Sequence, residues 1–294
     1  MPDLAIALKH LGNNVSGSDE SIPSDTSDKL LKNGLNPKAL GWHPEKIDSG
    51  LECIILSPQV EAHNPELNRA KELQLPIYSF AEYLCRHSED KQRLVVAGSY
   101  GKTMIVALIM HVLHFHKRKF DYCISGPVPG FDSLVRLSNA PVIVIESQDT
   151  WASVLDRTPS FLKYHHHIGV IPGIEWQQSE SYPTKEEYTK QFSLFGASTP
   201  KGGTLIYFEL DSVVAALGKM DKPDVQYIPF KTHPSDYQGG QELLLTADKQ
   251  RLPVKLTGKH NFQNISAAQE ALKKIGITSE LFYQAVSSFE GIRN

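Results

Sequence analysis

A strand, a glycine loop and a helix follow one another without interruption between residues 94 and 113. Residues 94–97 (LVVA) are apolar and favour a buried strand, and residues 98–103 read GSYGKT. Apolar side chains then recur every three or four positions from Ile105 to Leu113, which predicts a helix that buries one face. This order predicts an α/β unit in which the loop joins the end of a strand to the start of a helix.

The loop has the chemistry of a phosphate-binding site. N–H groups converge at the start of a helix, the helix dipole adds partial positive charge, and glycines let the backbone approach phosphate oxygens closely. Lys102 adds a full charge, and the Thr103 hydroxyl is placed to ligate Mg²⁺. Val96 stands where the longer GxxxxGK[ST] motif has its first glycine. The alternative is a tight turn with a surface lysine. The residues expected to contact a nucleotide here are Gly98, Ser99, Gly101, Lys102 and Thr103.

An acidic side chain ends the next apolar strand. Residues 141–145 are almost wholly apolar and lead directly to Glu146. Ligands of open parallel sheets bind at the carboxyl edge of the strands, so Glu146 is well placed to hold an Mg²⁺ that bridges ATP oxygens. The alternative is a strand-end glutamate that pairs with a surface cation.

Composition limits the class of protein. A chain of 294 residues has room for two domains, and 40% hydrophobic with 21% charged residues is typical of a globular protein. The net charge of −3 gives no electrostatic reason to expect a nucleic acid or a membrane as a partner. No apolar run approaches the roughly 18–20 residues of a transmembrane helix, and the first residues lack the pattern of a signal peptide. Three widely spaced cysteines indicate reduced thiols in a cytoplasmic protein.

Strands and helices are expected to alternate along the chain. Helices are predicted over residues 3–11, 27–33, from 65 onward, 79–87, 103–116, 184–195, 211–219, 261–274 and 279–288. Strands are predicted near 15 and 77 and over 53–56, 94–97, 142–146, 167–172, 204–208, 242–246 and 252–257, with a turn-rich stretch over 231–240. This alternation indicates an α/β fold with mostly parallel sheets covered on both faces.

The polar stretch 87–92 separates two regions. We expect an N-terminal Rossmann-like domain over 1–88, a central domain with a P-loop ATPase-like sheet over 89–288, and the start of a linker over 289–294. A nucleotide-binding unit normally has a strand and a glycine turn before its first helix, whereas here the first helix begins at Asp3. The first strand is therefore expected to be missing from this chain.

Several weaker candidate sites have equally ordinary explanations. Asp19, in the SGSD stretch after the strand predicted near 15, suits a ribose hydroxyl or a phosphate, or belongs to a plain turn. Gln177 and Gln178 follow a buried strand and are weak Mg²⁺ ligands at best. Three consecutive histidines at 165–167 point to alternate faces, which disfavours a metal site. Three polar residues open a later helix and either read the edge of a base or cap the helix; they are His260, Asn261 and Asn264.

Together these segments resemble the Mur ligase family of peptidoglycan synthesis, and most closely its UDP-N-acetylmuramate ligases, which add L-alanine or recycle a tripeptide. The resemblance runs in order through nearly the whole chain. It is carried by VSGSD at 15–19, NPEL at 64–67, VVAGSYGKT at 95–103, VIVIE at 142–146, GIEW at 173–176, GKHNFQN at 258–264 and FEG at 289–291. The stretches 128–137 and 151–156 favour the recycling type.

The resemblance implies ATP-dependent amide formation through an acyl phosphate, with ATP and Mg²⁺ as cofactors and with UDP-N-acetylmuramate and an amino acid or peptide as partners. Lys102 and Glu146 are the catalytic residues that it implies, and Thr103 and Glu146 the metal ligands. His260, Asn261 and Asn264 would lie near the adenine. Ser18, Asp19 and Ser57 would lie at the edge of the UDP site. The acceptor and the oligomeric state are not fixed by the sequence.

The chain departs from the family pattern at several positions. The family usually has histidine at Tyr100, threonine at Met104 and glutamate at Asp149, and an Asp-His pair where Gln177 and Gln178 stand. The family also continues into a C-terminal domain, which we expect to be absent here, so that the 294-residue chain alone does not ligate. The departures leave a second hypothesis, a degenerate homologue that binds a nucleotide or UDP-sugar without turnover.

Overall fold

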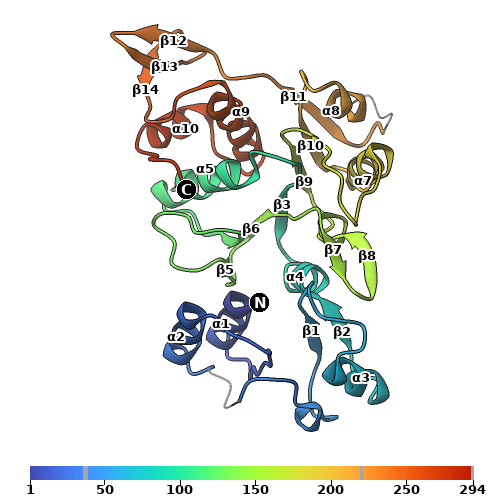
Figure 1. Cartoon of the computed structure of the whole chain (residues 1–294). Coiled ribbons are helices and arrows are strands. Elements are labelled where there is room, and N and C mark those ends of the chain that lie inside the picture. The colour runs from blue at the N-terminus through green and yellow to red at the C-terminus, as the bar shows by residue number, and fades with distance from the viewer. Residues whose placement is uncertain (36–38, 219–221, 293–294) are drawn as a thin grey trace.

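The computed structural model describes residues 1–35, 39–218 and 222–292. Its centre is a seven-stranded sheet in the order β11-β10-β9-β3-β6-β4-β5, in which every neighbouring pair is parallel except β4 and β5 (Figure 1). The strands are β3 (Gln92–Val96), β4 (Asp121–Cys123), β5 (Val135–Arg136), β6 (Val142–Glu146), β9 (Ile168–Ile171), β10 (Thr204–Phe208) and β11 (Gln226–Phe230). The predicted α/β fold with a mostly parallel sheet is confirmed.

Helices cover both faces of this sheet because consecutive residues of its central strand point to opposite sides. Leu94 and Val96 lie in one buried core, and Val95 and Ala97 lie in the other. The first core is closed by α5 (Lys102–Phe115), α9 (Lys259–Lys273) and α10 (Ser279–Val286). The second lies under α4 (Phe80–His87), α6 (Ser160–Lys163), α7 (Lys185–Ala197) and α8 (Ser212–Leu217).

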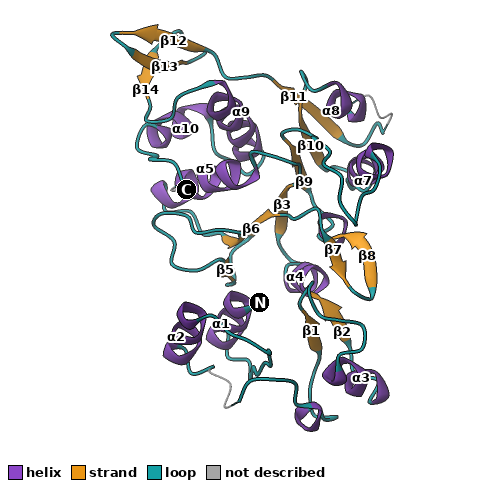
Figure 2. Cartoon of the chain, viewed as in Figure 1, coloured by secondary structure: helices purple, strands orange, loops and turns teal. Residues whose placement is uncertain are grey.

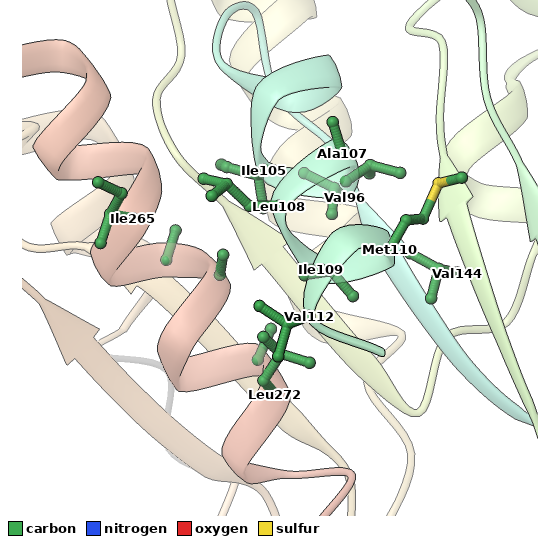
Figure 3. Close-up of a cluster of buried hydrophobic side chains, with 14 of the residues drawn as sticks. Val96, Ile105, Ala107, Leu108, Ile109, Met110, Val112, Val144, Ile265 and Leu272 are labelled. Carbon is green, nitrogen blue, oxygen red and sulfur yellow. The ribbon is translucent and has the colours of Figure 1, made fainter. Parts of the chain in front are cut away.

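Helix α5 is apolar around most of its circumference, since it is buried on several sides. It contacts α9, α10 and strands β3 and β6, and Figure 3 shows side chains such as Val112 and Leu272 filling the space between α5 and α9. Its 14 residues nevertheless fall short of a bilayer-spanning length. In the three described ranges no helix combines the length and the apolarity that a membrane span requires.

The N-terminal region contains α1 (Pro2–His10), α2 (Ser24–Lys32), the 3₁₀ turn η1 (Pro44–Lys46), β1 (Ile54–Leu56), α3 (Pro65–Glu72) and β2 (Ile77–Ser79). Strands β1 and β2 form a separate parallel pair. Asn64 caps α3 by accepting from the N–H groups of Glu66 and Leu67. Ser79 forms a capping box with Glu82 at the start of α4, and Thr184 does the same with Glu187 at the start of α7.

Helix α1 packs against the edge of the large sheet through the Asp3 carboxylate. Asp3 accepts hydrogen bonds from Lys29 Nζ (2.6 Å), Ser133 Oγ (2.7 Å) and the N–H of Leu134 (2.7 Å). Burial alone would raise the pKa of Asp3, but these bonds outweigh it and lower that pKa. Leu4, with other apolar side chains of α1, belongs to the same core as β3. The N-terminal region is therefore joined to the central sheet by a continuous apolar core.

Several sequence predictions were wrong. Val15 lies in an irregular segment, because no strand among the described residues pairs with it, and nearby only an isolated bridge joins Asp19 to Gly41. The stretch at 231–240 contains β12 (Ser235–Gln238), which joins β13 (Gln241–Leu245) and β14 (Arg251–Pro253) in an antiparallel sheet at the periphery (Figure 2). Short strands were also missed, among them β7 (Trp151–Ser153) and β8 (Asp156–Pro159), which form a separate antiparallel pair. Residues 219, 293 and 294 of the predicted segments lie outside the described residues.

The histidine run illustrates the alternation of faces. His166 is fully buried, its ring lies 4.0 Å from that of Phe195, and its Nε2 pairs with Thr199 Oγ1 at 2.9 Å, whereas His165 is exposed. Among the described residues no group of three histidine, cysteine, aspartate or glutamate side chains is arranged to hold a metal. His166 therefore packs in the core of the protein.

Burial lowers the pKa of His166 from 6.5 to about 3, which predicts acid lability. The unfolded chain binds a proton below pH 6.5 while the folded chain keeps the ring neutral, so this contribution is present above pH 6.5 and is lost as the pH falls. We expect the free energy of unfolding, measured by urea titration, to fall by about 2 kcal/mol from pH 7 to pH 5 through this residue. His166→Gln should flatten that dependence, and an unchanged slope would contradict the assignment.

Candidate functional site

The glycine loop lies at the carboxyl edge of β3, where the strand passes into α5 (Figure 1). Two backbone bonds hold it against the end of β9: the Ala97 N–H donates to the Val170 carbonyl at 2.9 Å, and the Ser99 N–H donates to the Gly173 carbonyl at 3.0 Å. Gly101 is the N-cap of α5 with φ +76°, and no side chain caps the helix. The N–H groups of the first turn are thus left for a ligand, as an anion site requires.

Lys102 bends back over this loop. Its Nζ donates to the carbonyl of Gly98 at 2.5 Å, and its side chain is only partly exposed. The ammonium therefore lies beside the same backbone that presents the N–H groups. The Lys102 side chain is therefore not extended into solvent, as it would be in the alternative of an ordinary turn with a surface lysine.

Glu146 lies next to the loop because the sheet register pairs it with Val96. Its carboxylate is buried, with the residue 5% exposed, and it accepts from Thr103 Oγ1 at 2.6 Å and from the Ser125 N–H at 3.0 Å. Within the described ranges no lysine, arginine or histidine forms an ion pair with it, so the predicted alternative of a surface ion pair is wrong.

The donor set of Thr103 and Glu146 fits Mg²⁺, which prefers hard oxygen ligands. Two protein oxygens 2.6 Å apart are few for a metal site. Mg²⁺ commonly fills its octahedron with water and substrate phosphates, and the adjoining N–H groups and Lys102 suit those phosphates. The pair therefore fits a cation delivered with a nucleotide better than a permanent protein-bound metal.

Asn264 reaches the loop from α9. A Cβ placed on Gly101 would lie 2.5 Å from Asn264 Oδ1, so the two are in direct contact. Asn264 is 7% exposed, so its side-chain amide lies at the loop in a largely buried position.

The other two candidates of this helix are less involved. His260 is exposed, and Asn261 Nδ2 donates to the Thr257 carbonyl at 2.8 Å. None of the three caps the helix: α9 begins after Gly258 without a side-chain cap. The structure therefore brings Asn264 to the loop and leaves His260 and Asn261 at the start of the helix.

The residues predicted for a UDP site are not brought together by hydrogen bonds among the described residues. Asp19 bridges Gly41 through its backbone and accepts from the Ser21 N–H at 3.3 Å. Ser57 follows β1 and donates to Gln59 Oε1 at 2.6 Å. Ser18 is part-exposed in the same irregular segment as Asp19. Their role stays a prediction.

Some residues around the loop were missed from the sequence. Gln263 Nε2 donates to the Pro172 carbonyl at 2.7 Å, and Tyr188 of α7 bonds Ser99 and Asp149. Tyr188 lies on the apolar face of α7 with Phe192, a pattern that indicates only core packing. Nothing in its spacing distinguishes a tyrosine whose hydroxyl serves the loop from one that merely packs.

Tyr100 packs against Gly173, at a position where any larger residue would clash with the phenol. A Cβ on Gly173 would lie 1.9 Å from Tyr100 Oη, so the phenol rests directly on that residue. Burial, and then the nearby Asp211 charge, raise the pKa of Tyr100. The side chain at the tip of the loop is therefore a neutral phenol.

Gly101→Ala tests the contact between the loop and Asn264. The added methyl group would meet the Asn264 amide and would be held at a φ that L-residues avoid. We expect a loss of about 1–2 kcal/mol in the free energy of unfolding from the backbone term, and a loss of nucleotide affinity from the clash. Thermal unfolding and titration with a fluorescent ATP analogue measure the two effects.

Gly202→Ala is the matched control, because Gly202 has φ +77° and nothing within 4 Å of an added Cβ. It should show a similar loss of stability with unchanged nucleotide affinity. Equal nucleotide affinity in the two variants would mean that the Gly101–Asn264 contact does not serve a ligand.

The chain is similar in sequence to known ligases. A family model described as "Mur ligase family, catalytic domain" matches residues 1–92. The UDP-N-acetylmuramate--L-alanine ligase of Carboxydothermus hydrogenoformans is 28% identical over 307 residues, covering 100% of this chain and 63% of the relative. That of Caldicellulosiruptor bescii is 27% identical, covering 99% and 64%. The chain thus spans less than two thirds of the length of these curated relatives.

Solved structures share the fold. The crystal structure of UDP-N-acetylmuramate:L-alanyl-gamma-D-glutamyl-meso-diaminopimelate ligase from Neisseria meningitides superposes with a TM-score of 0.88 at 20% identity, covering 100% of this chain and 96% of that chain. The UDP-N-acetylmuramate-alanine ligase of Thermotoga maritima gives 0.74 at 20% identity, covering 99% and 66%. The chain is thus similar to Mur ligases along its whole length, and the family model matches its first 92 residues.

Proposed function

We propose that this chain carries the nucleotide-binding and carboxylate-activating part of an ATP-dependent ligase that joins an amino acid or a peptide to UDP-N-acetylmuramate. The observation that carries the proposal is the juxtaposition of Lys102, Thr103 and Glu146 at one edge of the sheet. The names of the relatives support the class of substrate.

The positively charged and the oxygen-bearing groups of the site would bind different parts of Mg²⁺–ATP. The N–H groups at the start of α5 and the Lys102 ammonium would bind the β- and γ-phosphates of ATP. Thr103 and Glu146 would hold Mg²⁺, which supplies charge neutralisation on the transferring phosphoryl group. Asn264 would offer its amide to the nucleotide from its place beside Gly101, with His260 and Asn261 toward the adenine.

The reaction that we propose has two steps. A carboxylate oxygen of UDP-N-acetylmuramate attacks the γ-phosphorus, the bond from that phosphorus to the β–γ bridging oxygen breaks, and ADP leaves. The amine of the acceptor then attacks the acyl carbon, loses a proton, and expels inorganic phosphate. The protein's contribution is to hold the reactants in line and to stabilise charge, because phosphoryl transfer needs little else.

The proposed division of the chain follows the sequence. Residues 1–88, with Ser18, Asp19 and Ser57, would bind the UDP moiety. Residues 89–288 would bind ATP, and 289–294 would begin a linker. The continuous core between α1 and the central sheet supports a fixed orientation of the two regions.

A degenerate, non-catalytic homologue is the second candidate, and a specific observation favours it. Gln177 and Gln178 are exposed after β9, and neutral amides there bind a cation less well than a carboxylate or an imidazole. A protein of this kind would bind nucleotide and UDP-sugar without turnover.

One experiment separates the two functions. The chain is incubated with Mg²⁺, ATP, UDP-N-acetylmuramate and hydroxylamine, which captures an acyl phosphate as a hydroxamate without needing the acceptor site. Hydroxamate and phosphate that form only with all components support the ligase. Binding of both ligands by calorimetry without phosphate release supports the degenerate homologue. Failure to bind Mg²⁺–ATP contradicts both.

A further inference from the structure

A chain of hydrogen bonds crosses the region behind the phosphate loop. The Glu175 N–H donates to Ser99 Oγ at 2.7 Å, Ser99 Oγ and Tyr188 Oη are 2.9 Å apart, and Tyr188 Oη donates to Asp149 Oδ2 at 2.7 Å. Each hydroxyl has one proton to give. Tyr188 donates its proton to the Asp149 carboxylate, so the Ser99 hydroxyl donates to Tyr188. The donor and the acceptor of each hydrogen bond in the series are therefore known.

The phenol that joins these groups is held rigidly. Tyr188 is 4% exposed and packs against Tyr182 and Phe192, with ring centroids 5.0 and 5.2 Å away. Tyr182 donates from its own hydroxyl to the Asp149 carbonyl at 2.5 Å. Two tyrosines of the core therefore donate hydrogen bonds to Asp149, Tyr182 to its backbone carbonyl and Tyr188 to its carboxylate.

Burial raises the pKa of Tyr188 far above its ordinary value, and the bond to Asp149 acts in the same direction. The phenol stays protonated across the physiological range, and it remains a donor to Asp149 throughout.

The two ends of this series of hydrogen bonds lie in two different parts of the site, the phosphate loop and the acidic segment. Ser99 is part of the loop that precedes Lys102, and Asp149 lies three residues beyond Glu146. Because both bonds end on the one Tyr188 oxygen, the Asp149 carboxylate lies within two hydrogen-bond lengths of Ser99 Oγ. A buried tyrosine that only filled the core would need one partner for its hydroxyl. This one connects the loop to the acidic segment.

We propose that Tyr188 is a positioning residue that fixes the phosphate loop relative to the acidic segment 146–149, so that phosphates and cation are bound together. The proposal rests on the proposed function. It assigns to Tyr188 no contact with the nucleotide, and it predicts that the loss of its hydroxyl weakens the cation-dependent part of nucleotide binding.

The test compares Tyr188→Phe with Tyr164→Phe. Tyr164 is 3% exposed and belongs to the same apolar core, but its ring makes no hydrogen bond to the loop or to Asp149 among the described residues. Binding of a non-hydrolysable ATP analogue to the 294-residue chain is measured by calorimetry with Mg²⁺ and with EDTA. The gain in affinity on adding Mg²⁺ is the readout, since a general loss of stability would not change it selectively.

We expect Tyr188→Phe to reduce this Mg²⁺-dependent gain about 5- to 10-fold and Tyr164→Phe to leave it within twofold. Asp149→Asn should have little further effect in the Tyr188→Phe background, because the two act through one bond. If the wild-type chain binds the analogue and Tyr188→Phe shows the same Mg²⁺-dependent gain in affinity, the role proposed for Tyr188 is wrong and the proposed function is unaffected. A wild-type chain that binds no analogue overturns the proposed function as well.

Discussion

Lys102→Met is expected to weaken the binding of Mg²⁺–ATP about 10- to 100-fold while leaving the fold intact. The substitution keeps the length of the apolar stem and removes the ammonium, which lies 2.5 Å from the Gly98 carbonyl. A hydrogen bond from a charged donor contributes about 1.5–3 kcal/mol, and each 1.4 kcal/mol is a tenfold change in affinity. Calorimetric titration of the variant with an ATP analogue measures the loss, and the melting temperature reports on the fold.

Lys201→Met is the matched control. Lys201 is largely exposed, and among the residues that the structure describes its one ion pair is a surface pair with Asp224 at 3.2 Å, near the start rather than the end of β10. It should bind the analogue as the wild type does, because surface ion pairs contribute little and this one is remote from the loop. Wild-type affinity in Lys102→Met would show that the loop does not bind phosphates through this side chain.

The phosphate loop and its strand could be predicted because the local sequence determines them. A buried strand, two glycines at positive φ and an apolar helix each have a direct signature, and the register that pairs Val96 with Glu146 follows from two parallel apolar strands. Glu146 and Thr103 could be named for the same reason. Their hydrogen bond required only that neighbouring strands end at one edge of the sheet.

What the sequence did not predict depends on tertiary contacts. Strands β4 and β5 have three and two residues, and they are strands only because β6 and then β4 pair with them. From the sequence, Tyr188 would be interpreted as a core residue, because helical periodicity does not indicate which group a hydroxyl hydrogen-bonds to. Asn264 could be placed on its helix, but its contact with Gly101 depends on how α9 packs on α5.

Lys91 is the clearest case in which the sequence was misread. It lies in the polar stretch 87–92 predicted as a linker, yet it is 4% exposed. Its Nζ donates to the carbonyls of Ser138 at 2.8 Å and Ala140 at 3.0 Å, and it lies 3.4 Å from the carboxylate of the fully buried Asp121. It therefore fixes the entrance of β3, the strand that carries the phosphate loop.

Lys91→Met is expected to lower the free energy of unfolding by about 3–5 kcal/mol, the largest stability effect predicted for this chain. The variant leaves two carbonyls without a donor and a buried carboxylate without its cation, although Asp121 keeps its bonds from Ser138. Chemical denaturation measures the loss. Lys273→Met, which removes an i,i+3 surface pair with Glu270, should change stability by no more than about 0.5 kcal/mol.

A second variant separates the buried charge from simple packing. Lys91→Met combined with Asp121→Asn removes both charges, so the double variant should be more stable than Lys91→Met alone, because an amide is less costly to bury than an unpaired carboxylate. Equal stability of the two would mean that the lost carbonyl bonds, rather than the charge on Asp121, account for the effect. In that case the entrance of β3 would be held by hydrogen bonding to the 138–140 turn, with the ion pair making no net contribution.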